Sequence, residues 1–387
     1  MKKLGIIFGI LCLLVGCGEE KKQEPIVKEE PKDTVVSFVG VGDNLIHGSI
    51  YREADGFAGE MNDEEYDFKP MYKQVKKDIK KADISFINQE TILGGDELGL
   101  SGYPAFNSPT SIAEDLNDTG FNLYNLASNH SLDRSSDGII NALQAFDKLE
   151  GITYSGISDS EERASQIAVF EREGITFSFL SYTYGTNGIE PMNAYEVSYF
   201  DEEKIKNDVA KAKTISDVVI VSAHWGDENT FEPNDMQKKY AQLFADLDVD
   251  VVIGTHPHVI QPIEWLEGTN GNQTLVVYSL GNFLGGMLGV DNILSGMISF
   301  DFIKDVKTED IRIENVKWTP LVIHFEGNQN NIVDDRYNYA VYKLEDYSDK
   351  LAKKHVLNGY EGQRVDQLLL VEKTKQVINK SFYTEDK

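Results

Sequence analysis

Short apolar runs rich in β-branched residues alternate with helical patterns along most of this chain, from Val35 to Pro262. Because this alternation is typical of β-α units, it predicts parallel strands joined by helices. The apolar runs at 217–226 and 250–259 have few polar positions, as expected for strands covered on both faces. The pattern predicts strands at 35–44, 83–90, 121–130, 152–157, 217–226 and 250–259, a hairpin at 167–185 about Glu173-Gly174, and helices at 70–82, 108–118, 135–151 and around 235–247, with Ser108 capping the second helix.

The pattern changes after Pro262, where turns instead of helices separate the apolar runs. Antiparallel strands are expected at 263–268, 273–283, 297–304 and 311–325. Added to the β-α part, they favour two sheets packed face to face with helices outside, which is an α/β (α+β) fold in the form of a four-layer α/β/β/α sandwich. We expect this domain to span residues 34–325, and residues 326–387 to form a C-terminal extension with one or two helices.

The acidic composition limits the possible partners. The chain has 64 Asp and Glu against 37 Lys and Arg, a formal net charge of -27, so it repels nucleic acids and anionic lipid surfaces. We therefore expect no nucleic-acid partner. The two cysteines, Cys12 and Cys17, both precede the predicted domain, which excludes a disulfide framework or a cysteine zinc site within it.

The N-terminus has the pattern of an export signal. Two lysines precede an apolar run, Leu4 to Gly16, which is too short to span a bilayer. This run ends in LVGC at 14–17, which resembles a bacterial lipobox, so we predict a lipoprotein signal at 1–17 with Cys17 as the lipidated residue. An ordinary secretory signal cleaved nearby is the alternative. Residues 18–33 are highly charged and predict a flexible tether, so the expected location is the extracytoplasmic face of the cell membrane.

Polar residues collect where the predicted strands end. Because ligands of α/β sheets bind beyond the carboxyl ends of the strands, these positions are the most informative for function. Five of the seven histidines fall in or beside them. The residues are Asp43, Asn44, His47, Glu90, Asn129, His130, His224, Trp225, His256, His258 and Asn282. Carboxylates, an amide and imidazoles suit Mn, Zn or Fe, and a shared carboxylate would allow two ions.

Each of these residues also has a simpler interpretation. Asp43 is compatible with a helix cap or a turn, and Asn129-His130 with an ordinary loop. Trp225 is equally compatible with a core aromatic. His256-Pro257-His258 is more specific, because side chains two residues apart in an extended segment point the same way. The combination, more than any single residue, indicates a site.

Several stretches of the sequence resemble the CapA family, whose members are associated with the synthesis and export of poly-γ-glutamate capsules. They are GDN at 42–44, FINQE at 86–90, LASNHSLDRSSDG at 126–138, SAHWGDE at 222–228, DVVIGTHPHVIQPIEW at 250–265 and VYSLGNF at 277–283. The resemblance covers about residues 35–300. The family's fold is similar to that of calcineurin-like metallophosphoesterases, so the resemblance implies a metallophosphoesterase-like sandwich.

The resemblance also implies roles for individual residues. The metal ligands would be Asp43, His224, His256 and His258, with Glu90 as a bridging carboxylate, Asn129 as a further ligand and His130 as the proton donor to the leaving group. The chain departs from metallophosphoesterases at two points. First, Leu45 stands where these enzymes have a histidine, and His47 could supply the missing imidazole only if the loop after Asp43 curls back. Second, their second motif has Asp where this chain has Asn88 and Glu90. One ion, two ions or none are all open.

We therefore expect a lipid-anchored protein of the poly-γ-glutamate machinery with a metal-dependent, hydrolase-like site. Asn44, Trp225, Glu228 and Asn282 would line its substrate side. The expected partners are an anionic polymer such as poly-γ-glutamate, the membrane through the lipid anchor, and membrane subunits of a capsule synthesis complex. The alternatives are a non-catalytic accessory subunit of a polymer export complex and a wall-facing metallophosphoesterase. Because polymer and protein are both acidic, divalent cations or the lysines between residues 73 and 81 must compensate the charge.

Overall fold

The computed structural model describes residues 32–383. The predictions for the signal, Cys17 and nearly all of the tether fall on residues 1–31 and lie outside the described residues. From Asp33 onward the chain forms one compact unit. Within residues 32–383, no helix has both the length and the apolar composition needed to cross a bilayer.

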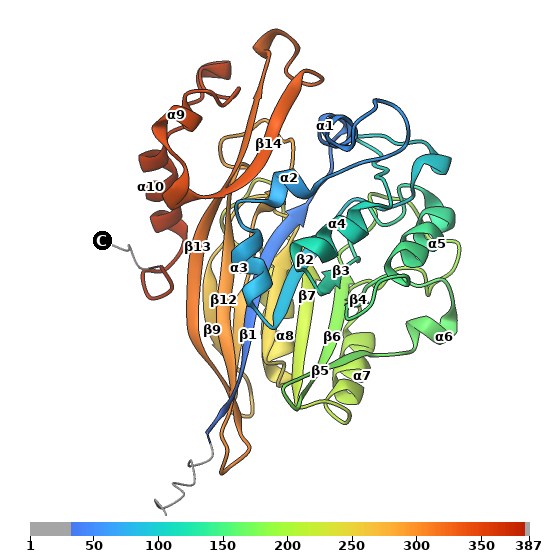
Figure 1. The fold of residues 1–387 in the computed structure, drawn as a ribbon. Helices are drawn as coiled ribbons and strands as arrows, with labels where there is room; N and C mark the ends of the chain where they lie inside the picture. Colours follow the sequence, from blue (N-terminus) through green and yellow to red (C-terminus); the bar gives the residue numbers. More distant parts are fainter. Residues whose placement is uncertain (1–31, 384–387) are drawn as a thin grey trace, which may run out of the picture. The chain divides into compact units, whose positions relative to one another are not determined.

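Two β-sheets that face each other form the centre of the fold (Figure 1). The first sheet has eight strands in the order β14-β13-β12-β1-β2-β3-β4, with β11 paired to β1. Its N-terminal strands run parallel, as the β-α pattern predicts, and the last three continue it antiparallel. The strands are β1 Thr34–Asn44, β2 Ile84–Gln89, β3 Leu123–Asn125, β4 Thr153–Ser155, β11 Asn282–Leu284, β12 Leu294–Lys304, β13 Ile311–Gly327 and β14 Arg336–Lys343.

The second sheet has six strands in the order β5-β6-β7-β8-β10-β9. Its four central strands are parallel, and an antiparallel strand closes each edge. The predicted hairpin about Glu173-Gly174 is confirmed, and both residues have the positive φ that its tight turn requires. The strands are β5 Ala168–Arg172, β6 Ile175–Thr183, β7 Val218–His224, β8 Val251–Thr255, β9 Ile263–Glu267 and β10 Gln273–Val277.

The second sheet is apolar on both faces because alternate residues of its strands enter different cores. In β7, Val218 packs in the core shared with the first sheet, whereas Val219 packs in a separate core on the opposite face. Between the sheets, the ring of Phe177 in β6 lies 5.1 Å from that of Phe302 in β12, centroid to centroid. This explains why the strand sequences at 217–226 and 250–259 are almost entirely apolar.

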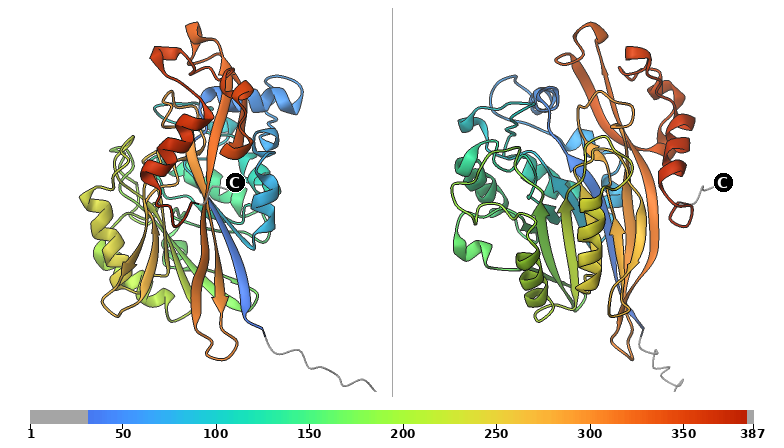
Figure 2. Two further views of the ribbon diagram at one scale, coloured as in Figure 1. Left: turned by 90° about the vertical axis from the view of Figure 1, so that its left-hand side faces the viewer. Right: turned by 180° about the vertical axis from the view of Figure 1, so that it is seen from behind.

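Helices cover the outer faces of the two sheets, which confirms the predicted four-layer α/β/β/α sandwich (Figure 2). Apolar residues of α7 and α8 fill the outer core of the second sheet, and α2 to α5 pack against the first sheet. The helices are α1 Gly48–Ala58, α2 Lys69–Tyr72, α3 Lys76–Lys81, α4 Ile112–Thr119, α5 Ser135–Phe146, α6 Glu161–Ala164, α7 Glu202–Ala212, α8 Asp235–Asp246, α9 Asp349–Ala352 and α10 Gln367–Val377.

Two predicted helices differ from those observed. The helix predicted at 70–82 is divided into α2 and α3, because the Val75 amide donates to the Tyr72 carbonyl, a tighter i to i+3 bond than in an α-helix. The helix predicted to be capped by Ser108 begins only at Ile112. The Ser108 hydroxyl donates to the Thr91 hydroxyl instead, so this serine fixes the loop after β2.

The predicted domain boundary after residue 325 falls inside strand β13. Strand β13 runs through it to Gly327, and β14 then pairs with β13 as the edge of the first sheet. The polar residues at 328–335 are therefore the connection of a hairpin and not the start of a separate segment. The expected helices of the extension are present as α9 and α10, and α10 runs beside β13 (Figures 1 and 2).

Candidate metal centre

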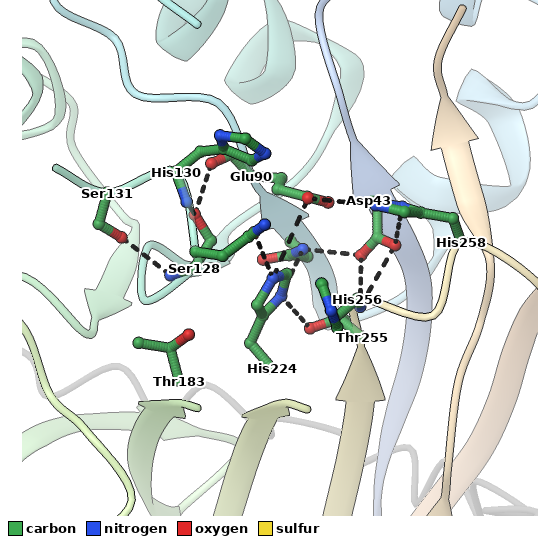
Figure 3. A network of polar contacts seen from close by, with 12 residues as sticks. Asp43, Glu90, Ser128, His130, Ser131, Thr183, His224, Thr255, His256 and His258 are labelled. Carbon is green, nitrogen blue, oxygen red and sulfur yellow. Dashed lines mark hydrogen bonds and ion pairs between the residues drawn. The ribbon is translucent and has the colours of Figure 1, made fainter. Parts of the chain in front are cut away.

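The strand register brings polar residues of both sheets to one place (Figure 3). In the second sheet, His224 of β7 pairs with Thr255 of β8. In the first sheet, Asp43 of β1 pairs with Asn88 of β2 and with Asn282 of β11. Because these strands run parallel within each sheet, their carboxyl ends lie together, and the predicted ligands meet in one buried cluster.

Glu90 lies at the centre of this cluster, directly after β2. Its side chain is buried, yet neither carboxylate oxygen has a hydrogen-bond partner among the described residues. Oε1 lies 3.5 Å from Nε2 of His258 and 4.0 Å from Nε2 of His224. Burial raises the pKa of Glu90 well above its ordinary value. A buried carboxylate without hydrogen bonds is costly, and a cation held between these groups would compensate for it.

His258 is oriented by two oxygens. Its Nδ1 lies 3.1 Å from Oδ2 of Asp43 and 3.0 Å from Oδ1 of Asn282. Since both oxygens accept hydrogen bonds, Nδ1 bears a proton and Nε2 faces Glu90. Burial alone would lower the pKa of His258, but the carboxylates of Glu90 and Asp43 outweigh burial and raise the pKa to about 10.

His224 is also held from two sides. The amide oxygen of Asn129 accepts a hydrogen bond from Nε2 at 2.9 Å, and the Thr255 hydroxyl, 3.0 Å from Nδ1, donates to that nitrogen. Burial lowers the pKa of His224 well below its ordinary value, and the neighbouring imidazoles lower it further. The ring is therefore neutral, and it would bind an ion through Nε2 in the other tautomer, in which Nδ1 donates to the Thr255 hydroxyl.

His256 and His258 reach the cluster by a route that the sequence did not predict. Their φ angles are +95° and +58°, so the segment is not extended and the expected alternation of an extended chain does not apply. The ring centroids nevertheless lie 5.7 Å apart, and Nδ1 of His256 is buried without a hydrogen-bond partner in the described part of the chain. Positive φ at such residues costs on the order of 1–3 kcal/mol and is concentrated at functional sites.

Three overlapping groups of donor atoms, each within 4.8 Å, make up the cluster. They are Glu90-His224-His256, Asp43-Glu90-His258 and Glu228-His256-His258. Glu90, His256 and His258 each belong to two of these groups, and Glu90 is the only carboxylate among the three. The unpartnered oxygens of Glu90 and the free Nδ1 of His256 fit a divalent ion, and carboxylate and imidazole donors suit Mn, Zn or Fe.

His130 lies beside the donor groups and belongs to none of them. Its Nδ1 is 2.7 Å from Oδ2 of Asp133, and its ring packs edge-on against Phe106, with centroids 4.7 Å apart. The backbone amide of His130 donates to the Ser128 hydroxyl, which in turn donates to the Glu90 carbonyl. With Nδ1 held by Asp133, Nε2 is the nitrogen that can exchange a proton with a ligand.

Known proteins resemble this chain in sequence and in fold. Residues 37–287 match the family model described as bacterial capsule synthesis protein PGA_cap. The chain belongs to this family. This chain is 28% identical over 267 residues to the PGA biosynthesis protein CapA of Bacillus subtilis (strain 168). The aligned part covers 67% of this chain and 59% of that protein. With the capsule biosynthesis protein CapA of Bacillus anthracis this chain shares 26% identity over 175 residues, 44% of this chain and 41% of that one. The matched parts thus span less than two thirds of either relative.

Solved structures with a similar fold include a phosphatase from Mycoplasma pneumoniae, with a TM-score of 0.46 and 14% identity over 75% of this chain and 94% of that chain. A hypothetical protein from Thermus thermophilus gives a TM-score of 0.42 and 13% identity over 74% of this chain and 98% of that chain. These likenesses concern the fold alone.

Two residues predicted to line the substrate side of the PGA_cap site are buried away from it. The Asn44 side chain donates to Gln89 and accepts from the Tyr72 hydroxyl, so it is used within the first sheet. Trp225 is fully buried in the outer core of the second sheet, and its indole donates to the Tyr278 carbonyl. Neither side chain has free surface for a ligand.

The other two residues predicted on the substrate side have different positions. Asn282 is fully buried and orients His258, so it positions a predicted ligand instead of contacting substrate. Glu228 is exposed and contributes an oxygen to the third donor group. Of the four residues predicted to line the substrate side, Glu228 is therefore the one that lies at the solvent side of the cluster.

His47 does not supply the missing imidazole. Its Nδ1 accepts a hydrogen bond from the Gly286 amide at 3.1 Å, and it belongs to none of the donor groups. Sequence reasoning also missed Thr255 and Asp133, which hold the rings of His224 and His130. Both stand inside the quoted motifs, one before His256 and one three residues after His130, where a search for partners of each histidine would find them.

We expect Glu90→Gln to reduce divalent metal affinity by more than the roughly 10–100-fold typical of an outer-shell substitution, because it removes the carboxylate that two donor groups share. In the metal-free protein, the same change should lower the free energy of unfolding at neutral pH, because it removes one of the two carboxylates that stabilise charged His258. Metal content by plasma mass spectrometry and urea unfolding in chelator measure the two effects.

The matched control is Glu97→Gln, which changes an exposed carboxylate in the loop that follows. Equal metal content in Glu90→Gln and the wild type would contradict a metal centre at this position.

Proposed function

We propose that this PGA_cap protein is a metal-dependent hydrolase acting on an anionic polymer such as poly-γ-glutamate, anchored by lipid at Cys17 on the extracytoplasmic face of the membrane. The observation that supports this most is the unpartnered buried carboxylate of Glu90, held between neutral and charged imidazoles. Membership of the capsule synthesis family supports a polymer as the substrate. The B. subtilis relative bears PGA biosynthesis in its name, which is why we propose this polymer as the substrate.

Five side chains would hold one or two ions, with the amide oxygen of Asn129 as a further donor. They are Asp43, Glu90, His224, His256 and His258. A bound divalent ion would supply Lewis-acid polarisation of the scissile carbonyl or phosphoryl oxygen. The chain prepares this site in advance, because Thr255 and Asn282 fix two of the rings before any ion arrives.

His130 would protonate the leaving group. In hydrolysis of a γ-glutamyl amide, the C–N bond breaks, the hydroxyl of water joins the carbonyl carbon, and the nitrogen gains a proton. Nε2 of His130 would deliver this proton, and the remaining hydrogen of the water would restore it. Asp133 keeps the ring in place through its contact with Nδ1, at 2.7 Å. Phe106 packs edge-on against the same ring and limits its rotation.

Charge determines how an acidic polymer reaches this site. The chain has a net charge of -27, and Glu228 adds a carboxylate at the solvent side of the cluster. The lysines between residues 73 and 81 offer limited help, since Lys76 already pairs with Asp118 at 2.5 Å. Bound divalent cations are then the main source of attraction for the polymer.

We expect His130→Asn to lower the rate of hydrolysis by about 10²–10⁴-fold while leaving metal content unchanged, because His130 belongs to no donor group. Asp133→Asn should lower it less, since His130 is still present. Release of new amino groups from poly-γ-glutamate measures the reaction, and p-nitrophenyl phosphate tests the phosphoesterase alternative in parallel.

Cleavage of the phosphate ester alone would assign the site to phosphoester hydrolysis. Wild-type and His130→Asn proteins that are equally inactive on both substrates, with metal bound, would favour the accessory-subunit alternative.

We expect affinity for poly-γ-glutamate to fall sharply when chelator removes divalent ions, because both partners are acidic. Isothermal titration of the purified protein with polymer, with and without chelator, measures this. A Lys77→Gln, Lys80→Gln variant tests the basic segment separately. Binding that is equal with and without chelator would refute this account of the charge.

Cys17→Ser should release the protein from the membrane fraction into the medium, because a lipid anchor depends on that thiol. Cell fractionation followed by immunoblotting measures the distribution. Cys12→Ser is the matched control, because Cys12 lies within the predicted signal and should be dispensable for anchoring. Membrane retention of Cys17→Ser would rule out the lipid anchor.

A further inference from the structure

The loop at residues 285–292, between β11 and β12, helps to hold His258. The Asn292 side chain donates to the His258 carbonyl at 3.3 Å, and the Asn282 side chain donates to the Asn292 carbonyl at 3.1 Å. The amide oxygen of Asn282 also lies 3.0 Å from Nδ1 of His258. A shift of this loop would therefore move a predicted metal ligand.

The same loop contacts the opposite side of the site through His47. The Gly286 amide donates to Nδ1 of His47 at 3.1 Å, and the His47 ring packs edge-on against Phe106, with centroids 5.2 Å apart. Phe106 in turn packs against His130. The fit at residue 286 is close, because a Cβ there would lie 3.0 Å from Cγ of His47. The loop thus contacts His258, a predicted metal ligand, directly. It is linked to His130, the predicted proton donor, through the rings of His47 and Phe106.

Two side chains of the C-terminal region hold this loop from outside. Gln363 binds it twice, since its Oε1 accepts from the Val290 amide at 2.8 Å and its Nε2 donates to the Leu288 carbonyl at 3.0 Å. Lys373 of α10 pairs with Asp291 at 2.5 Å. These contacts join positions 73 to 82 residues apart, and they fix the middle and the end of the loop.

A third side chain, Arg336 at the start of β14, fixes the beginning of the loop. Its guanidinium donates to the Gly286 carbonyl and to the Val333 carbonyl, and it lies over the ring of Phe325. The side chain is 7% exposed, and no carboxylate of the described residues lies within ion-pair distance of it. Burying a charge without a counter-ion is costly, and the hydrogen bonds to these two carbonyls compensate for part of that cost.

From these contacts we infer that the C-terminal region, residues 326–383, is a positioning element for the metal centre. Arg336, Gln363 and Lys373 fix the loop at 285–292, and the loop fixes His258 and His47. The family match ends at residue 287, so the three positioning residues lie outside the matched part of the chain. The inference rests on the proposed function, because a positioned His258 serves catalysis only if the cluster holds a metal ion.

The test compares Gln363→Leu with Gln367→Leu in the full chain. Gln367 is a matched control, because its Nε2 also donates to two carbonyls, those of Leu344 and Glu345, but does not contact the loop. We expect Gln363→Leu to weaken Mn²⁺ binding by about 10–100-fold, as loss of an outer-shell partner does, and to speed hydrogen exchange of the amides at 285–292. Gln367→Leu should change neither by more than about twofold, although it loses a similar number of hydrogen bonds.

Lys373→Met and Lys373→Arg provide a second pair. Lys373→Met removes the charge, so it should weaken Mn²⁺ binding and raise the KM for poly-γ-glutamate by a larger factor than it lowers the midpoint of unfolding. Lys373→Arg restores the ion pair with Asp291, so it should restore both the Mn²⁺ affinity and the KM. A purely structural role would lower stability in both glutamine variants equally and leave Mn²⁺ affinity, KM and loop exchange unchanged, and that result would overturn the inference.

Failure of the proposed function gives a different result. If the wild-type protein binds no Mn²⁺ or other divalent ion, the metal centre is refuted, and hydrogen exchange at 285–292 still decides whether Gln363 fixes the loop. Unchanged exchange in Gln363→Leu would refute the positioning role whether or not metal binds.

Discussion

Glu90 has a carboxylate that the folded chain buries without giving it a hydrogen bond from any described residue. Both oxygens are buried and lack hydrogen bonds, while the Nε2 atoms of His258 and His224 lie 3.5 and 4.0 Å from one of them. The neighbouring residues maintain this arrangement, because Thr255 and Asn282 point the two rings toward the carboxylate and no side chain of the described residues donates to it. A ligand that binds only the folded state stabilises it, so an ion at Glu90 would raise the stability of the whole sandwich. Fold and metal are in this way linked through one side chain.

The alternation of strands and helices predicted the architecture well, because burial on two faces leaves a direct pattern in the sequence. The second sheet shows this most clearly, since Val218 and Val219 enter different cores. The motifs also predicted which residues meet. They could not predict how His256 and His258 meet, because positive φ at a non-glycine residue leaves no local pattern. The geometry there depends on contacts with Asp43 and Asn282, which are distant in sequence.

The residues misplaced by sequence reasoning share a physical cause. Asn44 follows Asp43, and Trp225 follows His224, at the ends of strands β1 and β7. Neighbouring residues in a strand point to opposite faces, so a residue directly after a ligand points away from the site. The C-terminal region was difficult for another reason. β14 is half-polar, and the contacts of Gln363 with Leu288 and Val290 span more than 70 positions, which no local pattern records.

The pairing of β1 with β12 has a consequence for the order in which the protein matures. Asp43 and Glu90 are made early, but β1 gains the neighbours on its other edge, β11 and β12, only when residues 282–304 are available. The three histidines of the donor groups lie at or after the ends of β7 and β8 in the second sheet. Contacts of such long range form late in folding. A partial chain therefore lacks the assembled ligand set, and an ion is acquired only after nearly the whole chain has emerged. The compartment in which folding is completed, and not the one in which the chain is synthesised, would then decide which ion the protein acquires.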